Sequence, residues 1–508
     1  MDIQKSIVLV TVDCLRADHV GFMGYARPTT PFLDSLAGES FVLPAAIVAG
    51  APTYYSIPAM LASRYPLALG RDVLGLAPDE PTLATVLKQA GYATAAFSAA
   101  NPYISSRFGY AQGFDAFHDF LDDEPAPISE EKTPPLSGDG WASRLNRRIQ
   151  AARPALGPLG VVYDELYFRY CQRTTKAAES LDTLRRFPAA DVIVDHACNW
   201  LASVGDAPFF LWLHLMDPHS PYYPKEASLA LMGQRNVTPS RARYLNSYWN
   251  RSDIGPGRLN HHRDEVVALY DAGIRWVDEQ LARLTKTLRS SNDWDKCIFA
   301  VTADHGEEFL DHDGRYHAPS RLTEELIRVP LLLRVPGSPK KEVSKSPFSM
   351  VHLAPTLLDA SGLSAPSEFQ GQSCWDHLRQ GTMAEGVAIS ECVAGCTNPF
   401  RAENRLGSRV LSVRESRFKL TVHFDRSAEH LYDLETDPGE HAPLAPASQK
   451  PVRRRLLEMA RVHLQRSSEQ RDERARLGAR LRDLQLEWTR SFPQHPGTQA
   501  FGSHPRSS

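Results

Sequence analysis

Unbroken runs of apolar residues divide this chain into predicted strands. The runs occupy residues 6–12 (SIVLVTV), 92–98 (YATAAFS), 209–215 (FFLWLHL), 297–303 (CIFAVTA) and 329–335 (VPLLLRV). Runs of this length without polar alternation are typical of strands that are buried on both faces of a sheet. Two of the runs end directly on an acidic residue, Asp13 or Asp304. A carboxylate at the end of a buried strand is poorly placed for packing and well placed for a binding site.

Apolar residues at helical spacing fill the intervals between these strands. The segments 30–40, 58–63, 83–90 and 265–288 are each predicted to be helical, and Pro58 is placed at a helix start. Strands that alternate with helices predict an α/β fold in which helices cover both faces of a mostly parallel sheet.

The chain is expected to contain one large unit and one smaller one. We predict a catalytic domain over 1–337, with an insertion rich in proline, glutamate and glycine at about 120–160. The remaining predicted segments are a charged loop at 338–347, a smaller subdomain at 348–445 with a helix at 350–361 and strands near 386–391, 409–414, 417–424 and 431–434, a charged helix within 446–490, and a disordered tail at 491–508.

Composition narrows the class of protein without identifying it. The 508 residues carry 57 basic and 60 acidic side chains, so the net charge is −3. No overall positive charge therefore favours the binding of nucleic acid. No run of about 18 apolar residues predicts a membrane span. The N-terminus lacks the features of a signal peptide. The seven cysteines are sparse and odd in number, which predicts a reducing, cytoplasmic setting.

The polar residues at the strand ends are the first candidates for chemistry. Asp13 follows the first strand, and Asp304 and His305 follow the run at 297–303. Aspartate and histidine offer a hard oxygen and an imidazole nitrogen to a divalent cation. Ligands collect at the carboxyl ends of strands in α/β sheets, so a shared site is expected. A helix cap at Asp13 and a solvated turn at Asp304 remain the alternatives.

Two further polar segments suit an anionic substrate. His214 and His219 leave the strand at 209–215, and His312, Arg315 and His317 follow the Asp304 segment. Imidazoles and a guanidinium bind anions through charge-assisted hydrogen bonds, and an imidazole can donate a proton. A polar surface loop is the alternative for the second segment.

The motifs taken together resemble the sulfatase family of the alkaline phosphatase superfamily. The matching segments are VDCLRADHVGFMGYARPTTPFLDSLA, SIPAMLASRYP, HLMDPHSPY, TADHGEEFLDHDGRYH and LIRVPLLLRVPG, followed by VHLAPTLLDASGL, FKLTVHF and HLYDLETDPGE. The resemblance spans about residues 5–445. It implies an alkaline phosphatase-like fold, with a large mixed, mostly parallel sheet flanked by helices and a smaller C-terminal α+β subdomain.

The resemblance also implies roles for individual residues. One divalent metal ion would be held by Asp13, the nucleophile, Asp304 and His305. His219 would contact the anionic group of the substrate. Either His312 or His317 would contact the same group or protonate the leaving group.

The nucleophile segment departs from the family pattern. Authentic sulfatases convert the first residue of a C-x-P-x-R motif to formylglycine, and no cysteine lies in this region. Alignment on the following helix places Thr53 at the nucleophile position and Ile57 at the arginine. A shifted alignment would place Ser56 and Pro58 on the motif, with Met60 at the arginine. Neither alignment retains the motif, so no formylglycine is expected.

Two other departures bear on the metal and the substrate. Many sulfatases carry two consecutive aspartates after the first strand, whereas this chain has Asp13 followed by Cys14. With fewer carboxylates and with His305 as a ligand, manganese, zinc or magnesium becomes more credible than calcium. Asn101 lies near the position where many sulfatases place a substrate-binding lysine.

The predicted function is a metal-dependent hydrolase or transferase that cleaves a sulfate or phosphate ester by in-line attack of a metal-bound threonine. The expected substrate is a small-molecule or glycan ester. One alternative is a two-metal phosphodiesterase with Asp217, His219 and His317 on the second ion. Another is a non-catalytic binding or scaffold descendant of the fold.

Overall fold

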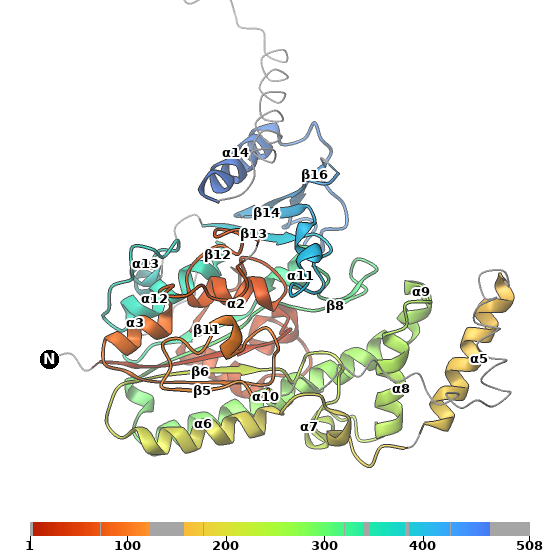
Figure 1. The fold of residues 1–508 in the computed structure, drawn as a ribbon, viewed down its shortest axis with the longest axis horizontal. Helices are drawn as coiled ribbons and strands as arrows, with labels where there is room; N and C mark the ends of the chain where they lie inside the picture. The colour runs from red at the N-terminus through yellow and green to blue at the C-terminus, as the bar shows by residue number, and fades with distance from the viewer. Residues whose placement is uncertain are drawn as a thin grey trace, which may run out of the picture.

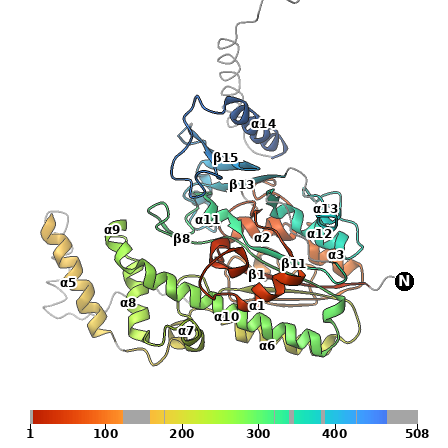
Figure 2. The same ribbon diagram turned by 180° about the vertical axis from the view of Figure 1, so that it is seen from behind.

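The computed structural model describes residues 4–71, 73–121, 157–175, 177–319, 321–338, 346–381, 386–426 and 428–467. A central sheet lies between two layers of helices, and a second, antiparallel sheet with one long helix stands at one end of the molecule (Figures 1 and 2). The predicted α/β architecture with a smaller C-terminal α+β subdomain is confirmed.

The central sheet has seven strands in the order β2-β11-β7-β1-β6-β4-β5. Neighbours from β7 to β5 are parallel, whereas β11 runs antiparallel to both β7 and β2. The sheet is therefore mixed and mostly parallel, as predicted. Its strands are β1 (Ser6–Val12), β2 (Phe41–Val42), β4 (Ala93–Ser98), β5 (Ala116–His118), β6 (Phe209–Leu215), β7 (Cys297–Ala303) and β11 (Leu331–Arg334).

Strand β1 lies at the centre of the sheet and sets the position of the candidate site. Val12 is paired with Leu215 of β6 on one side and with Ala303 of β7 on the other. Because the three strands are parallel and in this register, Asp13 and Asp304 leave the sheet at the same edge. The residues of β1, β6 and β7 are all buried, which accounts for their unbroken apolar sequences.

Helices pack on both faces of the central sheet (Figure 1). The helices α6 (Ala190–Val204) and α10 (Arg263–Ser290) cover one face, and α2 (Thr53–Leu61), α3 (Leu83–Gln89), α12 (Leu353–Ala360) and α13 (Trp375–Gln380) lie on the other. The other helices are α1 (Pro31–Leu36), α5 (Pro158–Thr174), α7 (Glu226–Leu231), α8 (Pro239–Trp249), α9 (Pro256–Leu259) and α11 (Glu324–Ile327). None of the helices in the described ranges is both long and apolar enough to cross a bilayer.

The C-terminal subdomain is a four-stranded antiparallel sheet with a helix on one face. Its elements are β13 (Val387–Val393), β14 (Arg409–Glu415), β15 (Phe418–His423), β16 (Ala428–Asp433) and α14 (Lys450–Arg466). Leu411, Leu420 and Leu431 of the sheet form a core with Leu456 and Leu457 of the helix. Two small sheets complete the fold, β10-β3-β12 (Arg328–Val329, Ala46–Ile47, Phe348–Ser349) and β8-β9 (Glu308–Phe309, Arg315–Tyr316).

The structure corrects two predicted elements. Helix α2 begins at Thr53, and Pro58 lies inside it rather than at its start. Proline has no N–H, so one hydrogen bond inside the helix is missing at this position. The N–H groups of the first turn have no partner inside the helix in any case. The predicted strand 329–335 is divided at Pro330, so that β10 joins a small sheet and β11 joins the central one.

Several predicted segments fall wholly or partly outside the described residues. These are most of the insertion at 120–160, most of the loop at 338–347, the end of the helix at 446–490, and the tail at 491–508.

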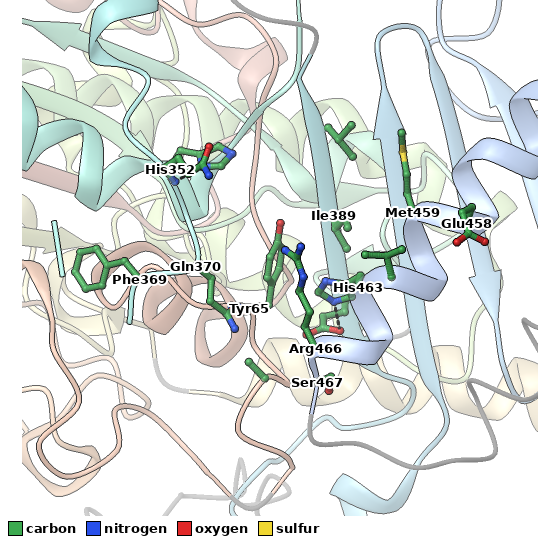
Figure 3. A pocket seen from close by; sticks show the side chains of 15 residues that line it. Tyr65, His352, Phe369, Gln370, Ile389, Glu458, Met459, His463, Arg466 and Ser467 are labelled. Atoms are coloured by element: carbon green, nitrogen blue, oxygen red, sulfur yellow. Dashed lines mark hydrogen bonds and ion pairs between the residues drawn. The ribbon is translucent and has the colours of Figure 1, made fainter. Parts of the chain in front are cut away.

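A cavity of about 610 Å³ lies between the unit built on the central sheet and the C-terminal subdomain (Figure 3). Tyr65, His352 and Phe369 line one side, and Ile389 and Met459 line the other. The Nδ1 atom of His352 accepts a hydrogen bond from the Gln372 amide at 2.9 Å. Burial lowers the pKa of His352 to about 4. The imidazole is therefore neutral in the folded protein at pH 5, where it is protonated in the unfolded chain.

The protein is expected to lose about 1–2 kcal/mol of stability through His352 alone between pH 7 and pH 5. Below the ordinary histidine pKa the unfolded chain binds the proton that the folded protein excludes. Stability therefore falls as the pH is lowered from 7 to 5. Urea unfolding of the wild type and of His352→Gln at both pH values measures the effect. The variant retains an acceptor for Gln372, so an equal loss in both proteins would contradict this prediction.

Candidate functional site

Three side chains from the ends of β1 and β7 meet in a fully buried cluster. The Nε2 atom of His305 lies 3.7 Å from Oδ1 of Asp13 and 3.5 Å from Oδ2 of Asp304. The Nδ1 atom of His305 donates to the Gly306 carbonyl at 2.8 Å. A carbonyl can only accept, so Nε2 carries the free lone pair and faces the two carboxylates. The structure therefore brings together the residues predicted from the two strand ends.

The first residue of helix α2 presents a hydroxyl to this cluster. Oγ1 of Thr53 lies 3.2 Å from Nε2 of His305, and the residue is only 3% exposed. Ser56 lies one turn later, is fully buried, and donates its hydroxyl to the Thr53 carbonyl at 3.3 Å. The hydroxyl that reaches the cluster is therefore that of Thr53, the residue that alignment on the following helix places at the nucleophile position.

The donor set fits a divalent cation. Oδ2 of Asp304 is buried and has no hydrogen-bond partner among the described residues, which is costly for a carboxylate oxygen. Burial and the charge of Asp13 both raise the pKa of Asp304. Burial opposes ionisation of Asp13, but His219, His214 and His305 together lower its pKa. Oxygen and nitrogen atoms that bind one ion lie about 3–3.6 Å apart, close to the separations around His305 Nε2.

His214 and Asn101 both contact Oδ2 of Asp13. Nε2 of His214 lies 3.3 Å from Asp13 Oδ2, and its Nδ1 lies 2.9 Å from the Thr11 hydroxyl. The Asn101 amide donates to the same carboxylate oxygen at 2.9 Å. Both were predicted to bind substrate, and in the structure both contact a carboxylate of the cluster.

His219 and His317 form the more open side of the site. Their rings lie 5.2 Å apart, and the ring of His317 lies 4.6 Å from that of His305. The His317 side chain is 22% exposed, whereas those of Asp13 and Asp304 are fully buried. These two imidazoles are therefore the part of the site that is nearest to solvent.

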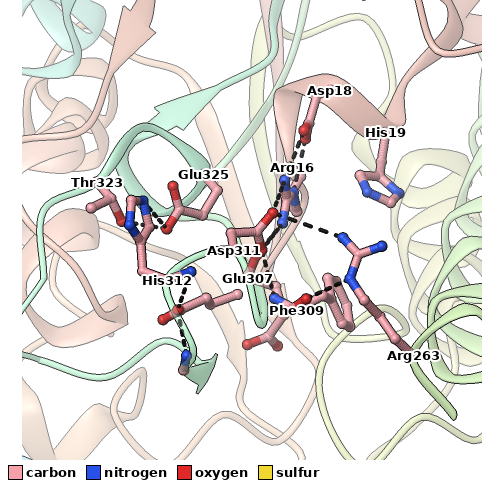
Figure 4. Close-up of polar contacts among 12 residues, drawn as sticks. Arg16, Asp18, His19, Arg263, Glu307, Phe309, Asp311, His312, Thr323 and Glu325 are labelled. Carbon is pink, nitrogen blue, oxygen red and sulfur yellow. Dashed lines mark hydrogen bonds and ion pairs between the residues drawn. The ribbon is translucent and has the colours of Figure 1, made fainter. Parts of the chain in front are cut away.

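His312 faces a different group of residues. Its Nε2 atom lies 3.6 Å from Oε1 of Glu325 (Figure 4). Its ring lies 5.2 Å from that of His441. Beside it, Arg16 pairs with Asp311 at 2.8 Å and holds the turn after β8. Of the two histidines left open by the sequence, the structure brings His317 rather than His312 to the cluster.

Arg315 and Asp217 also make contacts outside the cluster. Nη1 of Arg315 donates to the carbonyl oxygens of Trp249 and Arg251. Asp217 forms an ion pair with Arg185 at 2.8 Å. The structure thus places Arg315 against backbone carbonyls rather than among the residues of the cluster, and Asp217 is already neutralised by an arginine.

Cys14 and Glu307 were not singled out as site residues from the sequence. Cys14 has a φ of 61°, and its amide donates to Asp304 Oδ1 at 3.3 Å. Glu307 is fully buried, with Oε1 3.4 Å from Nδ1 of His317. The signal that would have found Glu307 is its place in the same short turn as Asp304 and His305.

Gly306 allows this turn to pack closely against helix α11. A Cβ atom at Gly306 would lie 1.9 Å from the Glu325 carbonyl oxygen, and the Gly306 amide donates to Leu326 at 2.9 Å. We expect Gly306→Ala to cost about 1–3 kcal/mol of stability and to displace His305. Chemical denaturation measures the loss. Gly38→Ala is the control, since nothing lies within 4 Å of its added Cβ; equal stability of the two variants would contradict the expectation.

Comparison with known proteins places this geometry in a family. The model of the sulfatase family matches residues 5–363, and that of the N-sulphoglucosamine sulphohydrolase C-terminal region matches residues 313–465. An N-acetylglucosamine-6-O-sulfatase of Bacteroides thetaiotaomicron is 32% identical over 202 residues, or 38% of this chain and 34% of the relative. The chain spans 34% to 50% of the length of several curated sulfatases that it matches.

Solved structures agree in fold. A protein bound to its substrate D-glucosamine-2-N,6-O-disulfate superposes with a TM-score of 0.63 at 17% identity, covering 91% of this chain and 98% of the other. The phosphonate monoester hydrolase of Agrobacterium radiobacter superposes with a TM-score of 0.59 at 18% identity, covering 91% and 95%. The family model covers more than half of the chain, and the fold agrees with it over most of its length. This chain belongs to the sulfatase family.

Proposed function

We propose that the protein is a metal-dependent hydrolase of phosphate, phosphonate or sulfate esters in which Thr53 is the nucleophile. The observation that carries the proposal is the Thr53 hydroxyl, which lies 3.2 Å from His305 Nε2 at the edge of the buried carboxylate pair. Asp13, Asp304, His305 and Thr53 would hold the cation. When bound, the cation would supply positive charge that favours the ionised hydroxyl and neutralises the ester oxygens.

The surrounding residues supply the remaining steps. Thr53 Oγ1 gives its proton to solvent and forms a bond to the phosphorus or sulfur atom, while the bond from that atom to the alcohol oxygen breaks. His317 or His219, on the open side, donates a proton to the departing alcohol. Asn101 and His214 keep the Asp13 carboxylate in place throughout. Water then forms a bond to the same phosphorus or sulfur atom as the bond to Thr53 Oγ1 breaks. This step releases the phosphate, phosphonate or sulfate product, and a proton of that water restores the threonine hydroxyl.

We favour phosphorus over sulfur as the centre attacked. A threonine hydroxyl made nucleophilic by a neighbouring cation is suited to phosphorus, and the residue at the nucleophile position offers no thiol for conversion to formylglycine. The relatives include both chemistries, since one is an N-acetylglucosamine-6-O-sulfatase and another is a phosphonate monoester hydrolase. A sulfated sugar therefore remains the second candidate substrate class.

A substrate panel tests this proposal. Purified protein is assayed with aryl sulfate, aryl phosphate, bis-aryl phosphate and aryl phosphonate monoester, each with and without added divalent metal. We expect metal-dependent turnover of at least one phosphorus ester at a higher rate than the sulfate. Turnover of the sulfate alone would reverse the preference, and no turnover of any ester would favour a binding role for the fold.

A further inference from the structure

The cavity between the central-sheet unit and the C-terminal subdomain is separate from the ester site, since its lining residues include none of Asp13, Asp304 and His305. Its volume of about 610 Å³ lies within the range of about 300–1,000 Å³ that is typical of small-molecule sites. Protein interiors are otherwise closely packed, so a hollow of this size is unusual. We infer that this cavity binds a small organic monoanion with an apolar body, of the class of medium-chain carboxylates.

One part of the cavity wall is apolar and suits the body of such a ligand. Strand β13 contributes Val387 and Ile389, helix α14 contributes Met459 and Val462, and Phe369 belongs to the loop after α12 (Figure 3). Removing methylene groups from water against these side chains favours binding. The unbranched side chain of Met459 can adapt to ligands of different shape.

Arg466, in the last turn of α14, brings a positive charge to the cavity. Figure 3 shows its side chain beside that of Tyr65. The guanidinium forms no ion pair or hydrogen bond with any residue in the described part of the chain. Arg453, Arg455 and Arg461 of the same helix each pair with a glutamate. The Arg466 guanidinium is therefore available to an anion, which it can bind through charge-assisted hydrogen bonds.

Two further side chains in the wall offer hydrogen-bond donors. Because Nδ1 of His352 accepts from the Gln372 amide at 2.9 Å, the Nε2 atom of this neutral imidazole carries the hydrogen. Oε1 of Gln370 accepts from the Tyr65 amide at 2.7 Å. The amide nitrogen of Gln370 then has two hydrogens and no partner among the residues that the structure describes. A ligand that complements these N–H groups presents acceptors, as a carboxylate does.

The two acidic residues in the wall are already paired and do not exclude an anion. Glu391 is fully buried, and its Oε2 lies 3.1 Å from Nε2 of His463 and 3.6 Å from Nη1 of Arg409. Burial opposes ionisation of Glu391, but Arg409 and His463 lower its pKa to about 2. Glu458 pairs with Arg461. The unpaired guanidinium thus leaves one positive charge, which suits a monoanion better than a doubly charged phosphate monoester.

Isothermal titration calorimetry of the full-length protein with octanoate tests this site. We expect saturable binding of one octanoate per chain, with the negative heat-capacity change that marks burial of apolar surface. Octan-1-ol and octyltrimethylammonium carry the same chain with a neutral or a positive head. Each should bind about 10-fold more weakly or worse, since the charge-assisted contact is lost. No saturable binding of octanoate, or equal binding of the three compounds, would overturn the site.

Matched variants locate the bound octanoate. Arg466→Met should weaken binding by about 10-fold or more. Val462→Trp fills the cavity from a position that is 37% exposed, and it should block binding. Arg455→Met is the control, since it removes the same charge from the same helix at a residue that pairs with Glu415 outside the cavity. Equal weakening in Arg466→Met and Arg455→Met would contradict the inference.

The Asp304→Asn variant separates this inference from the proposed function. It should bind octanoate as the wild type does, because Asp304 is not among the residues that line the cavity. Loss of octanoate binding in Asp304→Asn would place the carboxylate at the buried cluster and overturn the cavity site. The inference does not depend on which ester is cleaved, so a failure of the substrate panel leaves it standing.

Discussion

Thr53→Ala should lower turnover of the best ester substrate by on the order of 10³–10⁶-fold, the range seen when a nucleophile is removed. The substitution removes the one hydroxyl that lies 3.2 Å from His305 Nε2 and leaves the buried carboxylate pair intact. Binding of the cation and of the ester should change far less than the rate. Steady-state kinetics on the ester selected by the panel measures both quantities, because kcat should fall while KM stays within a few-fold.

Two matched variants sharpen this result. Thr53→Ser keeps a hydroxyl at the helix start and should retain measurable turnover. Ser56→Ala removes a hydroxyl that donates to the Thr53 carbonyl, so it should leave turnover nearly unchanged. If Ser56→Ala were inactive and Thr53→Ala active, the alternative alignment of this segment would be correct.

Asp304→Asn should abolish both catalysis and the binding of metal by the cluster of Asp13, Asp304 and His305. The substitution removes a charge from a buried carboxylate whose Oδ2 has no partner among the described residues. In the wild type, added divalent metal should raise the Tm, since a ligand that binds only the folded protein stabilises it by mass action. The Asp304→Asn variant should show no rise in Tm from metal bound at this cluster. Thermal denaturation with and without metal, together with metal analysis, checks this expectation.

Asp217→Asn provides the control for that experiment. Asp217 is buried and pairs with Arg185, so the variant should lose stability while binding the metal as the wild type does. Loss of metal in Asp217→Asn would instead favour the two-metal arrangement in which Asp217 is a ligand. If Asp304→Asn retained the metal and its Tm rose as that of the wild type does, Asp304 would not be a metal ligand.

The central part of the site follows from the sequence because it depends on strands. Asp13 and Asp304 each come directly after a continuous apolar run, and parallel neighbours bring such ends to one edge of a sheet. The register of β1 against β6 and β7 does this in the structure. Thr53 could be placed because the segment aligns with the family motif on the residues that follow it, which end in Arg64, Tyr65 and Pro66.

The loop residues could not be predicted in the same way. His312, Arg315 and His317 lie within one short polar segment, and nothing local indicates which side chain faces the cluster. The choice is made by distant partners, since Glu325 holds His312, backbone carbonyls hold Arg315, and Glu307 lies against His317. Leu310, Asp313 and Tyr316 all have positive φ values, which redirect this segment in ways that sequence periodicity does not report.

The start of helix α2 was missed for a physical reason. Proline is favoured in a first turn, so the sequence predicts a helix that begins at Pro58. In the structure Pro58 is one turn inside a helix that starts at Thr53, and every residue of that helix is buried. Tertiary packing outweighs the local preference, and it is the earlier start that brings the Thr53 hydroxyl to the carboxylates.

The most direct test of the central claim is to trap the covalent intermediate on Thr53. Protein turning over the selected phosphorus ester is quenched in acid, digested and examined by tandem mass spectrometry. The account predicts a peptide in which Thr53 carries one phosphoryl or phosphonyl group, and its absence in Thr53→Ala. Active turnover with an unmodified Thr53, or with the group on another residue such as Ser56, would contradict it.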